Sequence, residues 1–186
     1  MIDETGYWKK ENAISHHIHS PLVDEWICDF FSYNKEKIIH DLGCGKGDYL
    51  KSLKGKGHNN LFGYEGDPIT IYNDLNIIKK NLTEPITDYV KGNVICLEVG
   101  EHVPKKYQEI FIDNMTKLCD EYLIFSWAIR GQGGYGHVNE LNNNEIIPII
   151  LEKGFILLEN ETANLRNVPE DYCRYFKKTL FVLKKI

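Results

Sequence analysis

Arginine is scarce in this 186-residue chain. Only Arg130, Arg166 and Arg174 occur among its 22 basic residues, and 27 acidic residues leave a formal net charge of −5. The chain has no basic stripe and no arginine-rich run, which are the usual marks of a protein that binds a large polyanion. We therefore do not expect nucleic acid as the main partner, although a single local groove could still bind it.

Other absences narrow the class of protein further. No apolar run reaches the length of a signal peptide or a membrane span, and no internal repeat or low-complexity segment occurs. The number of cysteines is odd and no CxxC pair is present, so we expect reduced, mostly buried thiols in a cytoplasmic protein without a membrane span. The cysteines are Cys28, Cys44, Cys96, Cys119 and Cys173.

The pattern of apolar residues predicts one α/β domain over residues 1–186, with 42% hydrophobic residues to fill its core. Strands are expected at 37–41, 61–65, 76–80, 93–99, 122–127, 155–159 and 179–184, and helices at 21–32, 48–54, 104–120 and 145–153, the last capped by Asn144. Residues 160–178 give no clear pattern. Strands that alternate with helices indicate a doubly wound, seven-stranded, mostly parallel sheet with helices on both faces.

The most informative segment follows the first strand. An apolar strand ends at Asp41 and leads into a loop with glycines at 43, 45 and 47, before the next helix. Glycines at these positions allow a sharp turn and a close approach of a ligand to the backbone. A dinucleotide site would have the spacing G-x-G-x-x-G and would place a diphosphate over the helix. A carboxylate beside the loop disfavours a diphosphate and favours a ligand with positive charge.

The motif Asp41-Leu42-Gly43-Cys44-Gly45-Lys46-Gly47 resembles motif I of the class I S-adenosylmethionine methyltransferases. The resemblance in strand order covers nearly the whole chain and implies a Rossmann-like fold. It also implies that Asp41, Gly43, Cys44 and Gly45 bind S-adenosylmethionine, whose sulfonium and ammonium groups are cationic.

The same resemblance implies further cofactor contacts at the ends of the next two strands. Glu65, followed by Gly66, is expected to bind the ribose hydroxyl groups, with Asp67 as the second candidate. Asn81 and Leu82 follow the third strand and are expected near the adenine.

The fourth strand is followed by Glu98, Glu101 and His102, and this E-x-x-E-H pattern resembles ubiquinone-pathway O-methyltransferases and small-RNA 2′-O-methyltransferases. In those enzymes such residues bind a divalent ion, and carboxylates with imidazole suit Mg²⁺ or Mn²⁺. His137, in the glycine-rich loop 130–137, is the candidate for a fourth ligand or a general base. A metal-free base, a lining of the substrate cleft and a purely structural role remain alternatives.

The first nineteen residues read as an irregular polar segment. It is interpreted either as a solvated segment or as a lid over the cofactor, and it contains Tyr7, Trp8, His16, His17 and His19.

The function that these features imply is methyl transfer from S-adenosylmethionine, with His102 and His137 as catalytic residues. Polar residues around the predicted site favour O-methylation of a hydroxylated small molecule, first of all a sugar, glycan or nucleotide-sugar. A phenolic acceptor and an RNA 2′-hydroxyl are the next choices. A module that binds S-adenosylmethionine without catalysis is the alternative from another class.

Overall fold

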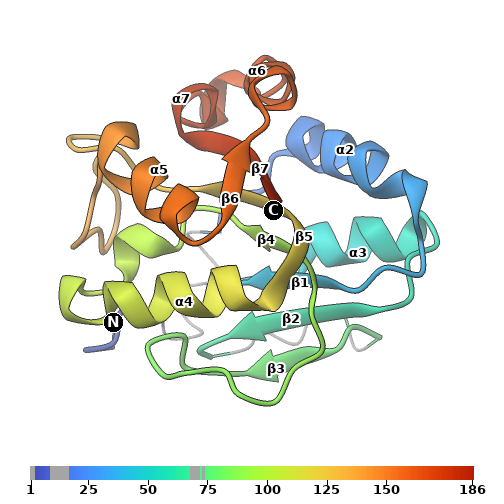
Figure 1. Cartoon of the computed structure of the whole chain (residues 1–186), viewed down its shortest axis with the longest axis horizontal. Helices are drawn as coiled ribbons and strands as arrows, with labels where there is room; N and C mark the ends of the chain where they lie inside the picture. The colour runs from blue at the N-terminus through green and yellow to red at the C-terminus, as the bar shows by residue number, and fades with distance from the viewer. Residues whose placement is uncertain (1–2, 9–16, 68–71, 73) are drawn as a thin grey trace.

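The computed structural model describes residues 3–8, 17–67, 72 and 74–186. It contains a seven-stranded sheet with the order β3-β2-β1-β4-β5-β7-β6 (Figure 1). Strands β1 to β5 are parallel to one another, and β7 runs antiparallel to both β5 and β6. The strands are β1 Ile39–Leu42, β2 Leu61–Glu65, β3 Ile77–Lys79, β4 Gly92–Cys96, β5 Cys119–Ser126, β6 Phe155–Leu157 and β7 Leu180–Lys185. The predicted doubly wound fold is confirmed.

Helices cover both faces of this sheet, as Figure 1 shows. The helices are α2 Pro21–Phe30, α3 Asp48–Gly55, α4 Gln108–Leu118, α5 Asn143–Glu152, α6 Glu159–Arg166 and α7 Phe176–Thr179, with 3₁₀ turns η1 Phe31–Tyr33, η2 Gly100–His102, η3 Lys105–Tyr107 and η4 Asp171–Cys173. Apolar residues of α4 and α5 pack on one face, and those of α2, α3 and α6 pack on the other. The two hydrophobic cores therefore share the sheet as their common wall.

Strand β4 shows how the sequence builds this arrangement. Val94 and Cys96 join the core under α4, while Ile95 between them joins the core under α2 and α3. Successive side chains of a strand point to opposite faces, so a strand that is covered on both faces must be apolar throughout. A short apolar run is the sequence signal of such a strand.

Several predicted boundaries are wrong, and each has a local cause. The fourth strand ends at Cys96 rather than at 99, because Glu98 has a φ of 52°, which is incompatible with a strand. Helix α5 is capped by Asn142 rather than Asn144, through a capping box with Glu145. The helix expected from Pro104 begins at Gln108, after a 3₁₀ turn.

Other boundaries shift less. The first helix ends at Phe30 and continues as the turn η1. Residues 160–178, which gave no clear pattern, contain most of α6, the turn η4 and the start of α7. All five cysteines are buried and unpaired, as expected.

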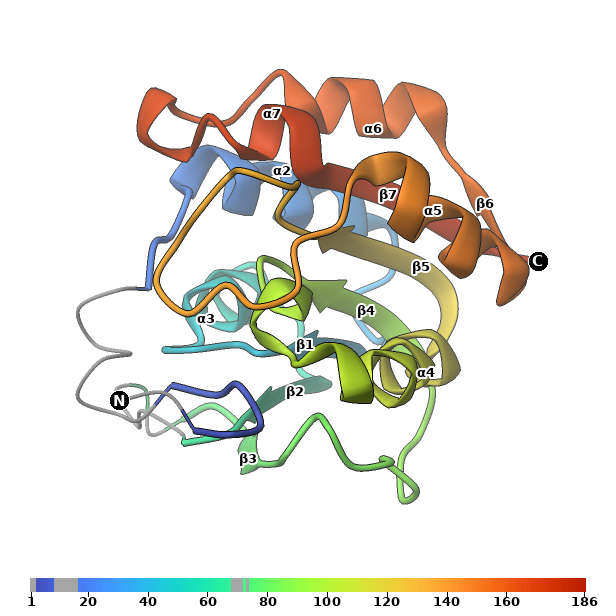
Figure 2. The same ribbon diagram turned by 90° about the vertical axis from the view of Figure 1, so that its left-hand side faces the viewer.

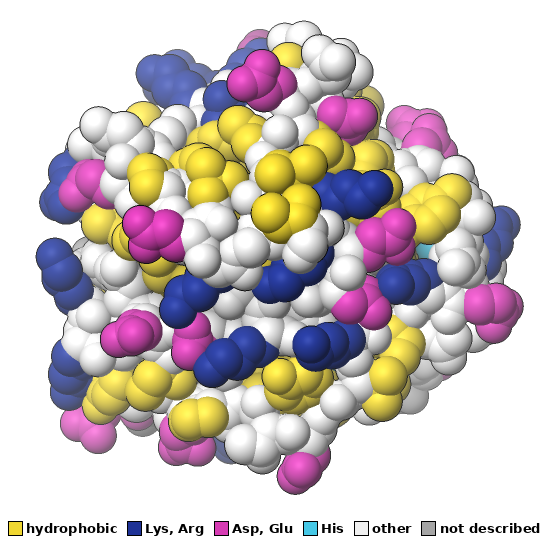
Figure 3. All heavy atoms as spheres, in the orientation of Figure 1, with side chains coloured by type: hydrophobic (Ala, Val, Ile, Leu, Met, Phe, Trp, Pro, Cys, Tyr) yellow, Lys and Arg dark blue, Asp and Glu magenta, His cyan; other side chains and the backbone are white. Residues whose placement is uncertain are grey.

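The carboxyl ends of the parallel strands lie at one edge of the sheet, which is where open α/β sheets bind ligands. Figure 2 looks toward this edge and shows that residues 3–8 and the loop between β5 and α5 both lie there. None of the described helices has the length and hydropathy needed to cross a bilayer. Basic and acidic side chains are interspersed over the face drawn in Figure 3, without a field of one sign.

Candidate functional site

A cavity of about 930 Å³ opens at the carboxyl ends of β1, β2 and β4. Its walls come from the glycine loop after β1, the turns after β2 and β4, the loop after β5, the N-terminal segment and the segment before β7. Ligand sites of this size suit a nucleoside cofactor together with a small second substrate.

The glycine loop is shaped by backbone angles that disfavour side chains. Gly43 has a φ of 71° and Gly45 a φ of 54°. A Cβ at Gly43 would lie 2.5 Å from the side chain of Val99. The backbone amide of Gly43 donates to the carbonyl of Tyr64 at 2.8 Å. The loop therefore fits tightly between β2 and the turn after β4, and glycine is required at 43 by the protein's own packing.

Asp41, beside this loop, has a buried carboxyl oxygen that a ligand could contact. Its side chain is buried, and its Oδ2 has no hydrogen-bond partner among the described residues. Burial raises the pKa of Asp41 to about 8, and the charge of Glu65 adds to the effect. A buried carboxylate without a partner is costly, so a cationic or hydrogen-bond-donating ligand group would relieve the site.

Glu65 already has backbone partners. Its Oε2 accepts a hydrogen bond from the amide of Gly45 at 2.9 Å, and its Oε1 accepts one from Gly66 at 2.8 Å. The structure thus brings Asp41, Gly43, Cys44, Glu65 and Gly66 together in one cavity wall. Binding of ribose hydroxyls by Glu65 stays a prediction.

Asn81 and Leu82 also line the cavity. The side chain of Asn81 closes a local turn, because its Oδ1 accepts from the amide and the hydroxyl of Thr83 at 3.0 and 2.8 Å. Its Nδ2 donates to Glu84 at 3.2 Å. Asn81 therefore shapes the rim of the cavity, and a contact with adenine stays a prediction.

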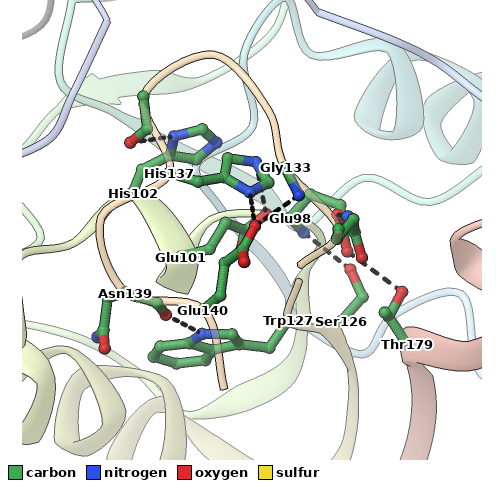
Figure 4. A network of polar contacts seen from close by, with 12 residues as sticks. Glu98, Glu101, His102, Ser126, Trp127, Gly133, His137, Asn139, Glu140 and Thr179 are labelled. Atoms are coloured by element: carbon green, nitrogen blue, oxygen red, sulfur yellow. Dashed lines mark hydrogen bonds and ion pairs between the residues drawn. The ribbon is translucent and has the colours of Figure 1, made fainter. Parts of the chain in front are cut away.

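Three of the four predicted metal ligands lie together. One potential ligand atom from each of Glu101, His102 and His137 lies within 4.8 Å of the others (Figure 4). Glu101 is completely buried, and neither of its carboxylate oxygens has a hydrogen-bond partner among the described residues. Burial raises the pKa of Glu101 well above its usual value, and the charge of Glu98 contributes. These features suit a site that accepts a cation.

Both imidazoles are oriented by protein oxygens. His102 Nδ1 lies 3.3 Å from the carbonyl oxygen of Gly136, and His137 Nδ1 lies 2.9 Å from Glu140 Oε1. These oxygens can only accept, so each Nδ1 carries a proton and each Nε2 of the neutral ring keeps its lone pair. Burial and the neighbouring His137 lower the pKa of His102 to about 4, which keeps that ring neutral. Partners on the second nitrogen are typical of metal-binding histidines.

Glu98, the fourth predicted ligand, does not belong to this group. Its carboxylate accepts hydrogen bonds from Gln132 Nε2 at 2.6 Å and from Thr179 Oγ1 at 3.3 Å (Figure 4). Its left-handed backbone turns the side chain toward the loop after β5 and the start of β7. Glu98 and His102 line the large cavity, whereas His137 lines an adjoining smaller pocket.

Tyr7, Trp8 and His17, from the described part of the N-terminal segment, pack over the site. The ring of Trp8 lies 5.0 Å from that of His102 and 5.4 Å from that of His17. A Cβ at Gly66 would lie 2.4 Å from the Tyr7 ring. For the described residues 3–8 and 17–19, these contacts favour the interpretation as a cover rather than as solvated chain. His16 lies outside the described residues.

His19 is part of a partly buried network that the sequence did not reveal. Its Nε2 lies 2.7 Å from Asp24 Oδ2, which also accepts from the Ser52 hydroxyl at 2.6 Å. The hydrogen bond to Asp24 raises the pKa of His19. His19 also lines the large cavity. The sequence also contains no signal for Gln132, because its hydrogen bond is to Glu98, which follows β4 and is distant in the sequence.

No protein-family model and no curated protein sequence matches the chain. Several solved structures do match. Magnesium protoporphyrin IX methyltransferase from Synechocystis PCC 6803, with S-adenosylmethionine bound, aligns at 17% identity over 95% of this chain and 79% of that chain, with a TM-score of 0.62. The sugar N-methyltransferase KedS8 from Streptoalloteichus sp ATCC 53650 aligns at 12% identity over 100% of this chain and 95% of that chain, with a TM-score of 0.67.

The methyltransferase domain of bacterial CtHen1-C is a third match, with 14% identity, a TM-score of 0.61 and coverage of 89% of this chain and 97% of that chain. At such identities these matches show a shared fold, and a shared fold serves many reactions. The reaction that this chain catalyses therefore depends on the residues of its cavity.

Proposed function

We propose that this protein transfers a methyl group from S-adenosylmethionine to a hydroxyl group of a small molecule, with a sugar unit as the favoured acceptor. The observation that carries the proposal is the buried carboxyl of Asp41. Its unpartnered oxygen lies in the wall of a large cavity, beside a tight glycine loop. The fold, which is shared with methyltransferases, supports the same proposal.

The cofactor fits the groups that the cavity offers. Asp41 would accept a hydrogen bond from the ammonium group, and the glycine loop would bring backbone close to the sugar and the methionine chain. Glu65 would bind the ribose hydroxyls with the oxygen lone pairs that the two backbone amides leave free. When bound, S-adenosylmethionine would supply a methyl group on a sulfonium: the acceptor oxygen would form a bond to this methyl carbon as the carbon–sulfur bond breaks, and S-adenosylhomocysteine would leave.

We assign removal of the acceptor's proton to the imidazole pair of His102, at the end of η2, and His137, in the loop after β5. His102 lines the cavity, and His137 lies behind it with its ring centroid 4.9 Å away. The carboxylate of Glu140 accepts a hydrogen bond from His137 Nδ1 at 2.9 Å and so orients the ring, as in other histidine and carboxylate pairs that act as bases. The remaining contribution of the protein is orientation of the two substrates.

A divalent ion would be held by Glu101, His102 and His137, and it would lower the pKa of an acceptor hydroxyl bound to it. Mn²⁺ is the sharper probe, because two imidazoles and one carboxylate suit it better than Mg²⁺. Glu101→Gln should lower Mn²⁺ affinity at least about 10-fold in a calorimetric titration. Glu98→Gln is the matched control, and equal losses in the two variants would contradict this ligand set.

The cofactor assignment is tested by titrating S-adenosylhomocysteine into the wild-type protein and into Asp41→Asn. We expect clear binding by the wild type and a loss of about 1–3 kcal/mol in the variant, the usual effect of losing a charged hydrogen-bond partner. Release of S-adenosylhomocysteine from S-adenosylmethionine with a panel of sugars then tests catalysis. A wild-type protein that does not bind the product would refute the proposal.

A further inference from the structure

One wall of the large cavity carries three basic side chains, of which Lys177 lies 3.8 Å from the carboxylate of Asp171. The segment before β7 contributes Tyr172, Arg174, Tyr175, Lys177 and Lys178 to the lining, and no acidic residue of this segment lines it. This local excess of basic side chains contrasts with the net charge of −5 for the whole chain. Within the cavity, the acidic side chains named above belong instead to the strand ends.

Arg174 differs from the other two arginines. Arg130 forms two hydrogen bonds of 2.8 Å to the carboxylate of Glu145. Arg166 donates to the carbonyl of Leu180 at 2.8 Å. The exposed side chain of Arg174 has no hydrogen bond, ion pair or ring contact with the part of the chain that the structure describes. An arginine without a partner in a cavity wall is a ready site for an oxyanion, which it can bind with two parallel hydrogen bonds.

The segment is fixed close to the site assigned to methyl transfer. Thr179, directly after Lys178, donates its hydroxyl to Glu98 at 3.3 Å. This contact holds the end of the segment beside the turn after β4. Arg174 and Lys178 line the same cavity as His102.

Tyr172 adds a flat surface to the positive charge. The residue is 58% exposed, and its hydroxyl donates to the carbonyl oxygen of His19 at 3.2 Å, which holds the side chain in place. A fixed, exposed aromatic ring can pack on a sugar ring or another cyclic acceptor. Together with Arg174, it offers contacts to a ring that carries an anionic substituent.

We propose that the acceptor is an anionic molecule, a hydroxylated ring with a phosphate or carboxylate group, and that Arg174 and Lys178 bind this oxyanion. The inference rests on the proposed function and deepens it, since it narrows the acceptor class. It favours sugar phosphates, nucleotide-sugars and uronic acids over neutral sugars.

The test uses the full chain loaded with S-adenosylhomocysteine, in EDTA and at constant ionic strength. Inorganic pyrophosphate, glucuronate and glucose are titrated separately and followed by calorimetry. We expect binding of at least one of the two anions and none of glucose at the same concentration. The stronger of the two anions identifies phosphate or carboxylate as the group recognised.

Three variants make the test specific. Arg174→Gln should weaken anion binding about 10-fold, and Arg174→Lys should weaken it less because the charge remains. Arg130→Gln is the matched control, since Arg130 lines the same cavity but is paired, and it should change the affinity less than about twofold. Absence of anion binding, or equal losses in Arg174→Gln and Arg130→Gln, overturns the inference. Failure of S-adenosylhomocysteine to bind in the loading step refutes the proposed function instead.

Discussion

Asp41 should change its protonation state when the cofactor binds. Burial raises its pKa to about 8, so it is mostly protonated at pH 7. An ammonium group beside it would favour the carboxylate, so binding of S-adenosylhomocysteine at pH 7 should release close to one proton. Calorimetry in two buffers with different ionisation enthalpies measures this number. Asp41→Asn should release none, and an unchanged release in that variant would place the proton elsewhere.

The pair of His19 and Asp24 should make stability depend on pH. The hydrogen bond to Asp24 raises the pKa of His19 in the folded protein. The stabilisation is therefore fully present below the ordinary histidine pKa of about 6.5 and is lost as the pH rises through the raised folded value. Asp24→Asn should remove this dependence and lower the His19 pKa in an NMR titration.

His17 is the internal control for that measurement. Burial and the charge of Lys46 lower the pKa of His17 to about 4. Its titration should not respond to the change at Asp24, because Asp24 is not among the causes of its shift. A parallel change of both histidines would indicate a general rearrangement rather than loss of one pair.

The loop between β5 and α5 is the element that brings His137 to the site. Glu140 organises it, accepting from the amides of Gly131 and Gly133, both at 2.7 Å, and from His137. Glu140→Gln should keep part of this hydrogen bonding but remove the charge that orients and stabilises the imidazole. We expect turnover to fall about 10- to 100-fold, while the affinity for S-adenosylhomocysteine changes less than about twofold. A large loss of cofactor affinity would show that the loop serves cofactor binding instead.

What the sequence predicts at this scale depends on how local the cause is. The strand and glycine loop around Asp41 follow from apolar runs and glycine spacing, which act within a few residues. The direction of the Glu98 side chain does not follow from the local sequence. It results from a left-handed backbone beyond the strand end and from hydrogen bonds to Gln132 and Thr179, which are distant in the sequence. The pairing of His19 with Asp24 depends equally on tertiary structure, so a polar segment gave no sign of it.

At the scale of the whole molecule, the cavity joins parts that are far apart in the chain. The N-terminal segment contacts the turn after β4 through Trp8 and His102, and the segment before β7 contacts it through Thr179 and Glu98. The sheet between the two hydrophobic cores connects the same strand ends. A ligand in the cavity should therefore stabilise the molecule as one unit rather than one edge of it.

Thermal unfolding should show this stabilisation. S-adenosylhomocysteine at 100 times its dissociation constant contributes about 2.7 kcal/mol to the folded state. For a chain of this length, 1 kcal/mol corresponds to about 2–4 °C, so the midpoint should rise by roughly 5–10 °C in one transition. The same concentration should shift Asp41→Asn much less. Two separate transitions, only one of which moves with the ligand, would mean that the cores on the two faces of the sheet unfold independently, and the cavity would then not couple them.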